Sequence, residues 1–233
     1  MGAGFYWGVT RFCKHTVVHV YTRMHSSGQE NIPKTGAFVL VSNHLNDGDP
    51  GLISTQSTRR ISWLAKQELF KIPGLGQFMV AYDAIAVRRG EADLAALRLA
   101  QAQLDKGVAI GVFAEGTRSG RRAAMKQAFP GAALFALRSG VPVLPVAITG
   151  SQLLSMPFVF FRPFWRRPRV EITFGEPFVL EKPARLNSES VKAATDQIMR
   201  RVAALLPESY RGYYGSAPAD GASVEPPSGM GEQ

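Results

Sequence analysis

The chain has 233 residues, with 27 Lys and Arg against 18 Asp and Glu, and 45% of its side chains are apolar. This length fits one ordinary domain or two small ones. No stretch approaches the roughly 20 uninterrupted apolar residues of a membrane-spanning helix, which excludes a protein that crosses the membrane several times. The single cysteine, Cys13, excludes an internal disulfide and a cysteine-based zinc cage, so a cytoplasmic setting is expected.

Positive charge is concentrated in the body of the chain. Residues 212–233 contain no Lys or Arg and three acids, so residues 1–211 carry a formal charge of +12 against +9 for the whole chain. This excess predicts an anionic partner, and nucleic acid, phosphorylated metabolites and anionic lipid surfaces all fit it. Residues 212–233 are predicted to form a disordered acidic tail that function does not require.

The first predicted element is an amphipathic helix over residues 5–24. Its apolar side chains recur near helical spacing, with Arg11, Lys14 and Arg23 between them. Such a basic helix either lies in a membrane interface or covers a protein core, and the pattern favours neither arrangement. Charges interrupt the apolar residues, so a signal peptide is not expected. Residues 1–27 are assigned to this N-terminal unit, ahead of a folded domain over residues 28–211.

Strands and helices alternate through the body of the chain. Apolar runs predict strands at residues 37–42, 61–65, 81–87, 108–114, 141–148 and 170–175. Helices are predicted at residues 50–57, 91–106, 125–138 and 190–206. This alternation predicts an α/β fold: a single layered domain with a mostly parallel central sheet flanked by helices, plus the N-terminal amphipathic helix.

Reactive and charged side chains follow three of these strands. His44 and Asp49 follow the first strand, Arg88 follows the third, and Glu115 and Arg118 follow the fourth. Ligands of open α/β sheets bind beyond the carboxyl ends of the strands, so these groups are expected at one rim.

His44 and Asp49 are candidates for an acid–base pair. Side chains five apart on a straight helix point about 140° from each other, so the pair meets only if the chain bends between them, and Gly48 and Pro50 favour a bend. A carboxylate on one imidazole nitrogen fixes the tautomer and leaves the other nitrogen as a general base. The alternative is that Asp49 only caps a helix and His44 is a polar loop residue.

The run from Glu115 to Arg118 combines groups suited to phosphate. Gly116 lets the backbone approach a ligand, Arg118 offers a forked donor, and Thr117 offers a hydroxyl. Glu115 cannot bind phosphate itself, but it can orient a cation. The alternative is that Glu115 and Arg118 form an ordinary ion pair on the solvated surface. Arg88 is equally compatible with binding phosphate and with being a solvated charge.

Taken together, these segments resemble the motif blocks of the glycerolipid acyltransferase family, and the most similar members are 1-acyl-sn-glycerol-3-phosphate acyltransferases. The resemblance covers about residues 28–180. The segments that carry it are Asn43-His44 with Asp49; Lys66-Gln67-Glu68-Leu69-Phe70 with Pro73, Gly76 and Arg88; Phe113-Ala114-Glu115-Gly116-Thr117-Arg118-Ser119; and Val141-Pro142-Val143-Leu144-Pro145-Val146. Ala114 stands where the family usually has proline and Asn46 where it often has serine. Neither departure removes a catalytic group.

The resemblance implies transfer of a fatty acyl group from acyl-CoA or acyl carrier protein to the free hydroxyl of lysophosphatidate, which gives phosphatidate. It implies that His44 is the general base and that Asp49 orients it. Val143 and Pro145 would line the acyl-chain site. The residues implied for the acceptor's phosphate are Arg88, Glu115, Gly116, Thr117, Arg118 and Lys126. No metal or cofactor is expected, because the thioester is already activated.

Residues 153–169 interleave aromatic side chains with arginines. This pattern suits a membrane interface, single-stranded nucleic acid or a buried strand edge. Given the family resemblance, a membrane interface is the favoured role of this segment and core packing is the second. No nucleic-acid partner is expected. The residues predicted to meet the membrane are Phe158, Phe161, Phe164, Trp165, Arg166 and Arg167.

The resulting hypothesis is a peripheral or monotopic enzyme on the cytoplasmic face of the cell membrane. Its partners would be the lipid surface, the lysophospholipid acceptor and the acyl donor. Two alternatives stay open: an acyltransferase for another lysophospholipid or an amino-acid lipid, and a catalytically silent lipid- or nucleic-acid-binding protein.

Overall fold

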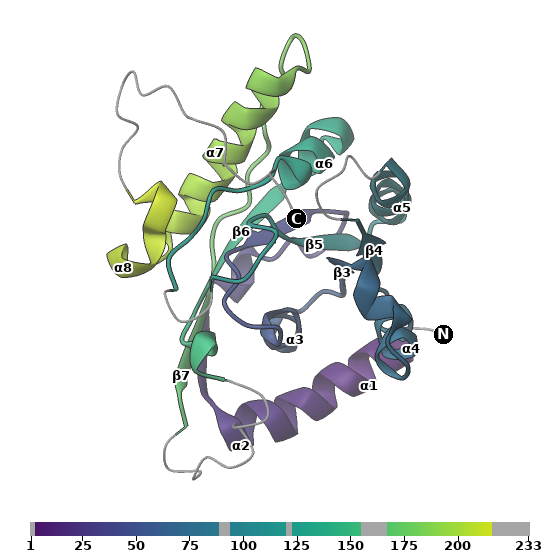
Figure 1. The fold of residues 1–233 in the computed structure, drawn as a ribbon, viewed down its shortest axis with the longest axis vertical. Coiled ribbons are helices and arrows are strands. Elements are labelled where there is room, and N and C mark those ends of the chain that lie inside the picture. Colours follow the sequence, from purple (N-terminus) through teal and green to yellow (C-terminus); the bar gives the residue numbers. More distant parts are fainter. Residues whose placement is uncertain (1–2, 89–93, 120–122, 155–166, 216–233) are drawn as a thin grey trace, which may run out of the picture.

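Within residues 3–88, 94–119, 123–154 and 167–215, which the computed structural model describes, seven strands form a sheet in the order β1-β7-β6-β2-β5-β3-β4 (Figure 1). The strands are β1 (Arg23–Ser27), β2 (Val39–Ser42), β3 (Ile61–Lys66), β4 (Ile85–Val87), β5 (Ala109–Phe113), β6 (Val143–Thr149) and β7 (Arg169–Phe174). Neighbouring strands pair in parallel, except that β6 and β7 are antiparallel. The predicted mostly parallel α/β sheet is therefore confirmed.

Helices cover both faces of the sheet. They are α1 (Ala3–Cys13), α2 (His19–Tyr21), α3 (Asp49–Gln56), α4 (Leu75–Ala81), α5 (Leu94–Asp105), α6 (Gly131–Ser139), α7 (Ser188–Ala204) and α8 (Glu208–Arg211). Figure 1 shows α1 and α3 on one side of the sheet and α5, α6 and α7 on the other. Successive side chains of a strand point to opposite faces of the sheet, so each strand contributes to both layers. In β2, Leu40 packs in the core on the α1 and α3 side, whereas Val39 and Val41 pack in the core on the α5 to α7 side.

The N-terminal region differs from its prediction at its end. The predicted helix reaches Met24, but the structure ends the helical segment at Tyr21, through a π-helical turn at Lys14–Val18. Met24 lies in β1, which pairs with β7, so the first 27 residues contribute an edge strand to the sheet. Sequence reasoning missed β1 because its residues, Arg-Met-His-Ser-Ser, are mostly polar and each is exposed or half-buried.

The first helix also packs on the body of the protein. Tyr6 is fully buried, and its ring stacks on that of Tyr82 with a centroid distance of 4.5 Å. The Tyr6 hydroxyl accepts a hydrogen bond from the backbone N–H of Ile61. The amphipathic pattern allowed either a membrane-interface helix or a helix that covers the core. At least one face of α1 covers the core.

Two other predicted elements begin later than expected. The strand predicted over residues 81–87 is β4, which starts at Ile85, because Ala81 still belongs to α4. The helix predicted over residues 125–138 is α6, which starts at Gly131. The preceding segment is not helical because its backbone N–H groups bind distant partners. These pairs are Met125 with the Tyr210 carbonyl, Lys126 with Glu115, Ala128 with the Tyr214 hydroxyl, and Phe129 with the Ala114 carbonyl.

The first residues of the expected disordered tail are ordered. A 3₁₀ turn, η8, spans Gly212–Tyr214, and Tyr214 is buried in the core beside α7. Residues 216–233 lie outside the described ranges.

Most of the residues predicted to meet the membrane also lie outside the described ranges, namely Phe158, Phe161, Phe164, Trp165 and Arg166. Arg167 is described, and its guanidinium donates a hydrogen bond of 2.6 Å to the His19 carbonyl. Among the helices of the described part of the chain, none is both long and apolar enough to cross a bilayer.

Candidate active site

A histidine–aspartate pair lies just beyond the carboxyl end of β2. The chain leaves β2 after Ser42 and turns back within a few residues, so that His44 Nδ1 lies 3.0 Å from Asp49 Oδ2. The same oxygen accepts hydrogen bonds from the backbone N–H groups of Leu45 and Asn46, at 2.7 and 2.8 Å. Asp49 is fully buried and His44 is 7% exposed. The carboxylate therefore orients the imidazole and organises the turn that carries it.

The bend predicted between the two residues is present, but Asp49 is not the helix cap. Gly48 occupies the N-cap of α3, Asp49 is the first helical residue, and Pro50 follows it. The Asp49 carboxylate points back to the loop instead of capping the helix. In the tautomer that donates Nδ1–H to Asp49, a neutral His44 leaves a lone pair on Nε2, which is what a general base requires.

An aromatic stack fixes the plane of the His44 ring. Phe113, the last residue of β5, stacks on His44 with a centroid distance of 4.0 Å, and Trp63 of β3 stacks on Phe113 at 4.8 Å. Trp63 Nε1 donates to the Ser54 hydroxyl at 3.0 Å, which ties the stack to α3. Gly111 makes room for it, since a Cβ there would lie 2.5 Å from the Trp63 ring. Sequence reasoning missed Trp63, whose spacing signalled only a buried strand.

Asn43 fastens the His44 loop to the neighbouring strand. Its amide group donates to the Ile148 carbonyl and accepts from the Ile148 N–H, both at 2.9 Å. This two-way bond continues the pairing of β2 with β6 past the end of β2. Asn43 stands beside His44 in the sequence motif, but its hydrogen-bond partner Ile148, 105 positions away, could not be inferred from the sequence.

Glu115 joins the two loops of the site. One carboxylate oxygen accepts from the backbone N–H of His44 at 3.1 Å, and the other accepts from the Ser119 hydroxyl and the Lys126 N–H, both at 2.8 Å. Burial raises the pKa of the Glu115 carboxyl, although these hydrogen bonds oppose the shift. The prediction that Glu115 orients a cation side chain is thus corrected, because its partners are backbone groups and a hydroxyl.

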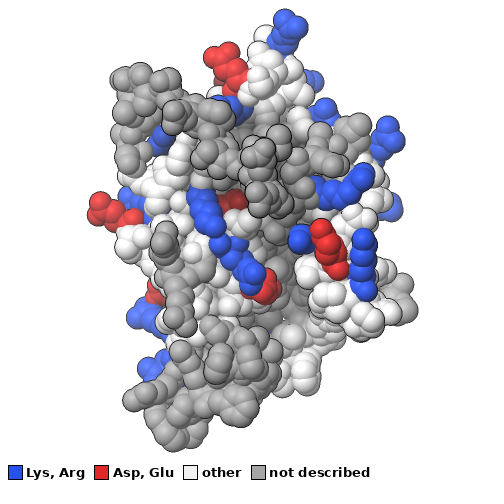
Figure 2. Space-filling model, in the orientation of Figure 1, with Lys and Arg blue, Asp and Glu red and all other residues white. Residues whose placement is uncertain are grey.

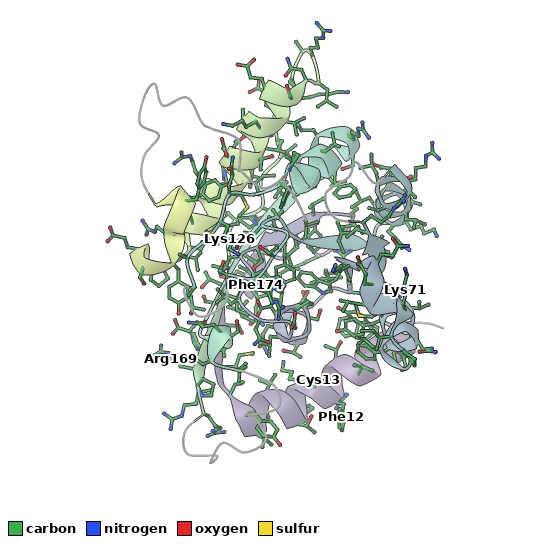
Figure 3. The ribbon with its side chains drawn as sticks, in the orientation of Figure 1. Phe12, Cys13, Lys71, Lys126, Arg169 and Phe174 are labelled. Carbon is green, nitrogen blue, oxygen red and sulfur yellow. The ribbon has the colours of Figure 1, made fainter. Side chains whose placement is uncertain are left out.

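The remaining polar residues of this loop gather around Lys126. The Lys126 ammonium donates to the Thr117 hydroxyl at 3.2 Å and to the Arg118 carbonyl at 3.1 Å. The Arg118 guanidinium forms an ion pair with Asp47, and both side chains are more than half exposed. Gly116 adopts φ +65°, and a Cβ there would lie 2.8 Å from the Phe129 ring, so the tight turn requires glycine. Figure 3 places Lys126 in the middle of the molecule, beside α8.

Three further residues predicted for the phosphate and acyl-chain sites can be placed in the fold: Arg88, Val143 and Pro145. Arg88 follows β4 at the edge of the sheet, and β3 lies between β4 and β5. Val143 packs in the core on the α5 to α7 side, whereas the His44 ring lies on the α1 and α3 side with Phe113. Strand alternation places Pro145 with Val143. Leu144 and Val146 are the β6 residues that face the His44 side, and the assignment of Val143 and Pro145 to an acyl-chain site stays a prediction.

Sequence comparison places the chain among acyltransferases. The family model described as Acyltransferase matches residues 23–149. The 1-acyl-sn-glycerol-3-phosphate acyltransferase of Bacillus subtilis is 25% identical over 180 residues, which are 75% of this chain and 83% of that protein. An enzyme of the same name from Borreliella burgdorferi is 31% identical over 52% of this chain and 49% of that protein. An uncharacterized acyltransferase of Schizosaccharomyces pombe is 32% identical over 54% of this chain and 47% of that protein. The chain thus spans about half the length of these last two relatives.

A solved structure shares the fold. The crystal structure of PlsC from Thermotoga maritima, a 1-acyl-sn-glycerophosphate acyltransferase, matches with a TM-score of 0.65 and 28% identity. The match covers 86% of this chain and 79% of that chain. Because the family match extends over more than half of the residues and includes His44, Asp49 and Glu115, the chain belongs to the Acyltransferase family.

Proposed function

We propose that the protein transfers a fatty acyl group from an acyl-CoA or acyl carrier protein thioester to the free hydroxyl of lysophosphatidate, and so forms phosphatidate. The observation that carries this proposal is the buried His44–Asp49 pair in a chain of this family. The names of the relatives from Bacillus subtilis and Borreliella burgdorferi support the choice of acceptor.

In the proposed reaction, His44 first accepts a proton from the acceptor hydroxyl and later donates it to the leaving group. Nε2 removes the proton of the acceptor hydroxyl while the hydroxyl oxygen attacks the thioester carbonyl carbon. Asp49 stabilises the imidazolium that forms, and the face of Phe113 adds a favourable contact with the positive ring. The tetrahedral intermediate then breaks its carbon–sulfur bond, and the departing thiolate takes the proton from His44. The products are an ester and a free thiol.

We propose that the acceptor's phosphate binds to the cationic side chains near the His44–Asp49 pair. Arg118 and Lys126 are exposed and lie within one loop cluster, and Figure 2 shows Lys and Arg side chains in the middle of this face. An exposed ion pair such as that of Arg118 with Asp47 contributes about 0–1 kcal/mol, so a phosphate that accepts a forked hydrogen bond can replace Asp47. Arg88 is kept in the proposal as a further cation, because it follows the carboxyl end of β4, a strand that runs in the same direction as β5.

Replacing Arg118 with alanine should weaken the use of lysophosphatidate selectively. The expected rise in the acceptor KM is about 10- to 100-fold, the range for losing hydrogen bonds to a charged group. Purified protein is assayed with an acyl thioester and either lysophosphatidate or the neutral monoacylglycerol. Arg138→Ala, which removes an exposed arginine from the last turn of α6, is the matched control.

The same assay tests the proposed function. Equal losses with both acceptors in Arg118→Ala would contradict the phosphate assignment. A wild-type protein that acylates another lysophospholipid or an amino-acid lipid but leaves lysophosphatidate unchanged would replace the proposed acceptor. Absence of acyl transfer to any of these acceptors would favour a lipid-binding protein without catalysis.

We propose that the protein works at the cytoplasmic face of the cell membrane, because its acceptor and product carry long acyl chains. The support is an exposed apolar surface on two helices, here the α1–α4 face. Its members are Phe5, Trp7 and Phe12 on α1 and Leu75, Phe78 and Val80 on α4, all 38–67% exposed. The ring centroids of Phe5 and Phe78 are 6.4 Å apart in an edge-on arrangement, which joins the two helices at this surface. Exposed basic side chains lie next to this surface: Arg11 on α1, Lys14 in the π-helical turn that follows α1, and Lys71 in the 3₁₀ turn before α4. Figure 3 marks Phe12 and Lys71.

Replacing Phe12 with serine should reduce binding to lipid. Phe12 is 67% exposed, and burying such a ring in a bilayer interface contributes roughly 1.5–3 kcal/mol, so vesicle affinity should fall about tenfold or more. The measurement is co-sedimentation with vesicles that contain an anionic phospholipid. Leu99→Ser is the control, since Leu99 is 56% exposed but lies on α5, across the sheet. Unchanged binding of Phe12→Ser would move the docking surface to residues 153–169.

A further inference from the structure

The last described turn of the chain holds the segment that carries Lys126. The backbone carbonyl of Tyr210 accepts from the Met125 N–H, and the Tyr213 N–H donates to the Met125 carbonyl, both at 2.9 Å. The Tyr214 hydroxyl accepts from the Ala128 N–H at 3.0 Å. Residues 210–214, here the C-terminal clamp, therefore bind the backbone on both sides of Lys126.

The other side of the same segment meets the candidate active site. The Lys126 N–H donates to Glu115, and the Phe129 N–H donates to the Ala114 carbonyl, both at 2.8 Å. The Lys126 ammonium reaches the Thr117 hydroxyl and the Arg118 carbonyl. Because this segment is not helical, the clamp and the site loop together define its path.

The clamp has its own fixed geometry. Gly212 adopts φ +48°, and a Cβ there would lie 2.2 Å from the Met125 carbonyl oxygen, so only glycine allows this approach. The Tyr210 hydroxyl accepts from Gln152 at 2.8 Å, which ties the clamp to the loop after β6. Tyr214 is 5% exposed, and burial raises the pKa of its hydroxyl to about 12, so the group stays neutral over the working pH range.

We infer that the C-terminal clamp positions Lys126 for the acceptor's phosphate, and that Tyr214 is a positioning residue which acts through the Ala128 N–H. This inference rests on the proposed function, since it names a further determinant of the same phosphate site. The clamp lies outside residues 23–149, the part of the chain that the family model matches. Acceptor recognition would thus depend on a segment beyond the shared catalytic region.

Tyr214→Phe in the full-length chain tests the inference, because it removes the hydroxyl and keeps the ring. The expected result is a rise of about three- to tenfold in the KM for lysophosphatidate, the range for one lost buried hydrogen bond, with the KM for the acyl donor unchanged. Amide hydrogen exchange of residues 125–129 should become faster. Tyr82→Phe is the control, because it removes a buried hydroxyl that is hydrogen-bonded to Thr10 at 3.0 Å and lies outside the clamp and the site loop. Gly212→Ala should repeat the selective rise in acceptor KM.

Three results would overturn the inference: equal changes in the two KM values, faster exchange with unchanged kinetics, or unchanged exchange in Tyr214→Phe. A wild-type protein that does not acylate lysophosphatidate would defeat the proposed function by itself. The clamp would then be judged by hydrogen exchange, where faster exchange of residues 125–129 in Tyr214→Phe supports it and unchanged exchange rejects it.

Discussion

His44→Ala is expected to lower acyl transfer by about 10²- to 10⁴-fold, the usual contribution of a positioned general base. The backbone of the loop should survive the change, because the His44 N–H still donates to Glu115 and the His44 carbonyl still accepts from the Ser119 N–H. The loss should therefore appear in kcat, with the circular dichroism spectrum and the vesicle binding of the wild type retained. The measurement is acyl transfer from acyl-CoA to lysophosphatidate in the presence of lipid.

Two aspartates close in sequence provide a matched pair for the same assay. Asp49→Asn keeps the shape of the buried side chain but removes the charge that stabilises the imidazolium, so a loss in the same range is expected. Asp47→Asn changes a side chain that is 77% exposed and should leave kcat within a few-fold of the wild type. A His44→Ala protein with more than a tenth of the wild-type activity would remove His44 from the role of general base.

Glu115→Ala should lower both stability and activity. The substitution leaves the His44 N–H, the Lys126 N–H and the Ser119 hydroxyl without their buried acceptor. Each unsatisfied buried group costs about 1–3 kcal/mol, so the free energy of unfolding should fall by roughly 2–5 kcal/mol once local water is admitted. Urea unfolding measures this loss. Glu115→Gln, which keeps an acceptor oxygen, should lose less, and an equal loss in both variants would contradict the role of the hydrogen bonds.

The pH dependence of stability offers a second check on Glu115. Burial raises the pKa of the folded carboxyl above its ordinary value of 4.5, so between these two pKa values the folded state binds more protons than the unfolded state. The contribution of Glu115 to stability must then increase as the pH falls through this window and be complete below 4.5. The wild-type protein should therefore gain stability relative to Glu115→Gln between neutral pH and pH about 5. A relative loss over this range would show that the pKa is lowered.

Sequence reasoning succeeded where the signal is local. The turn that joins His44 to Asp49 is encoded by neighbouring Gly48 and Pro50, and the buried strands β2, β5 and β6 are continuous apolar runs. It failed where the partner is distant. The segment before α6 has a helical pattern, but its N–H groups are taken by Glu115 and by the C-terminal clamp, up to 86 positions away. The same holds for Asn43, whose role depends on a contact across the sheet.

The pairing of β1 with β7 bears on how the protein is made. Ser27 and Thr173, which are partners in these strands, are 146 positions apart, so a growing chain releases β1 long before β7 has been synthesised. The edge of the sheet is thus closed late, and contacts of such separation slow folding. Until β7 has been made, the polar strand β1 has no partner in the sheet, whereas α1 can already pack on Ile61 and Tyr82.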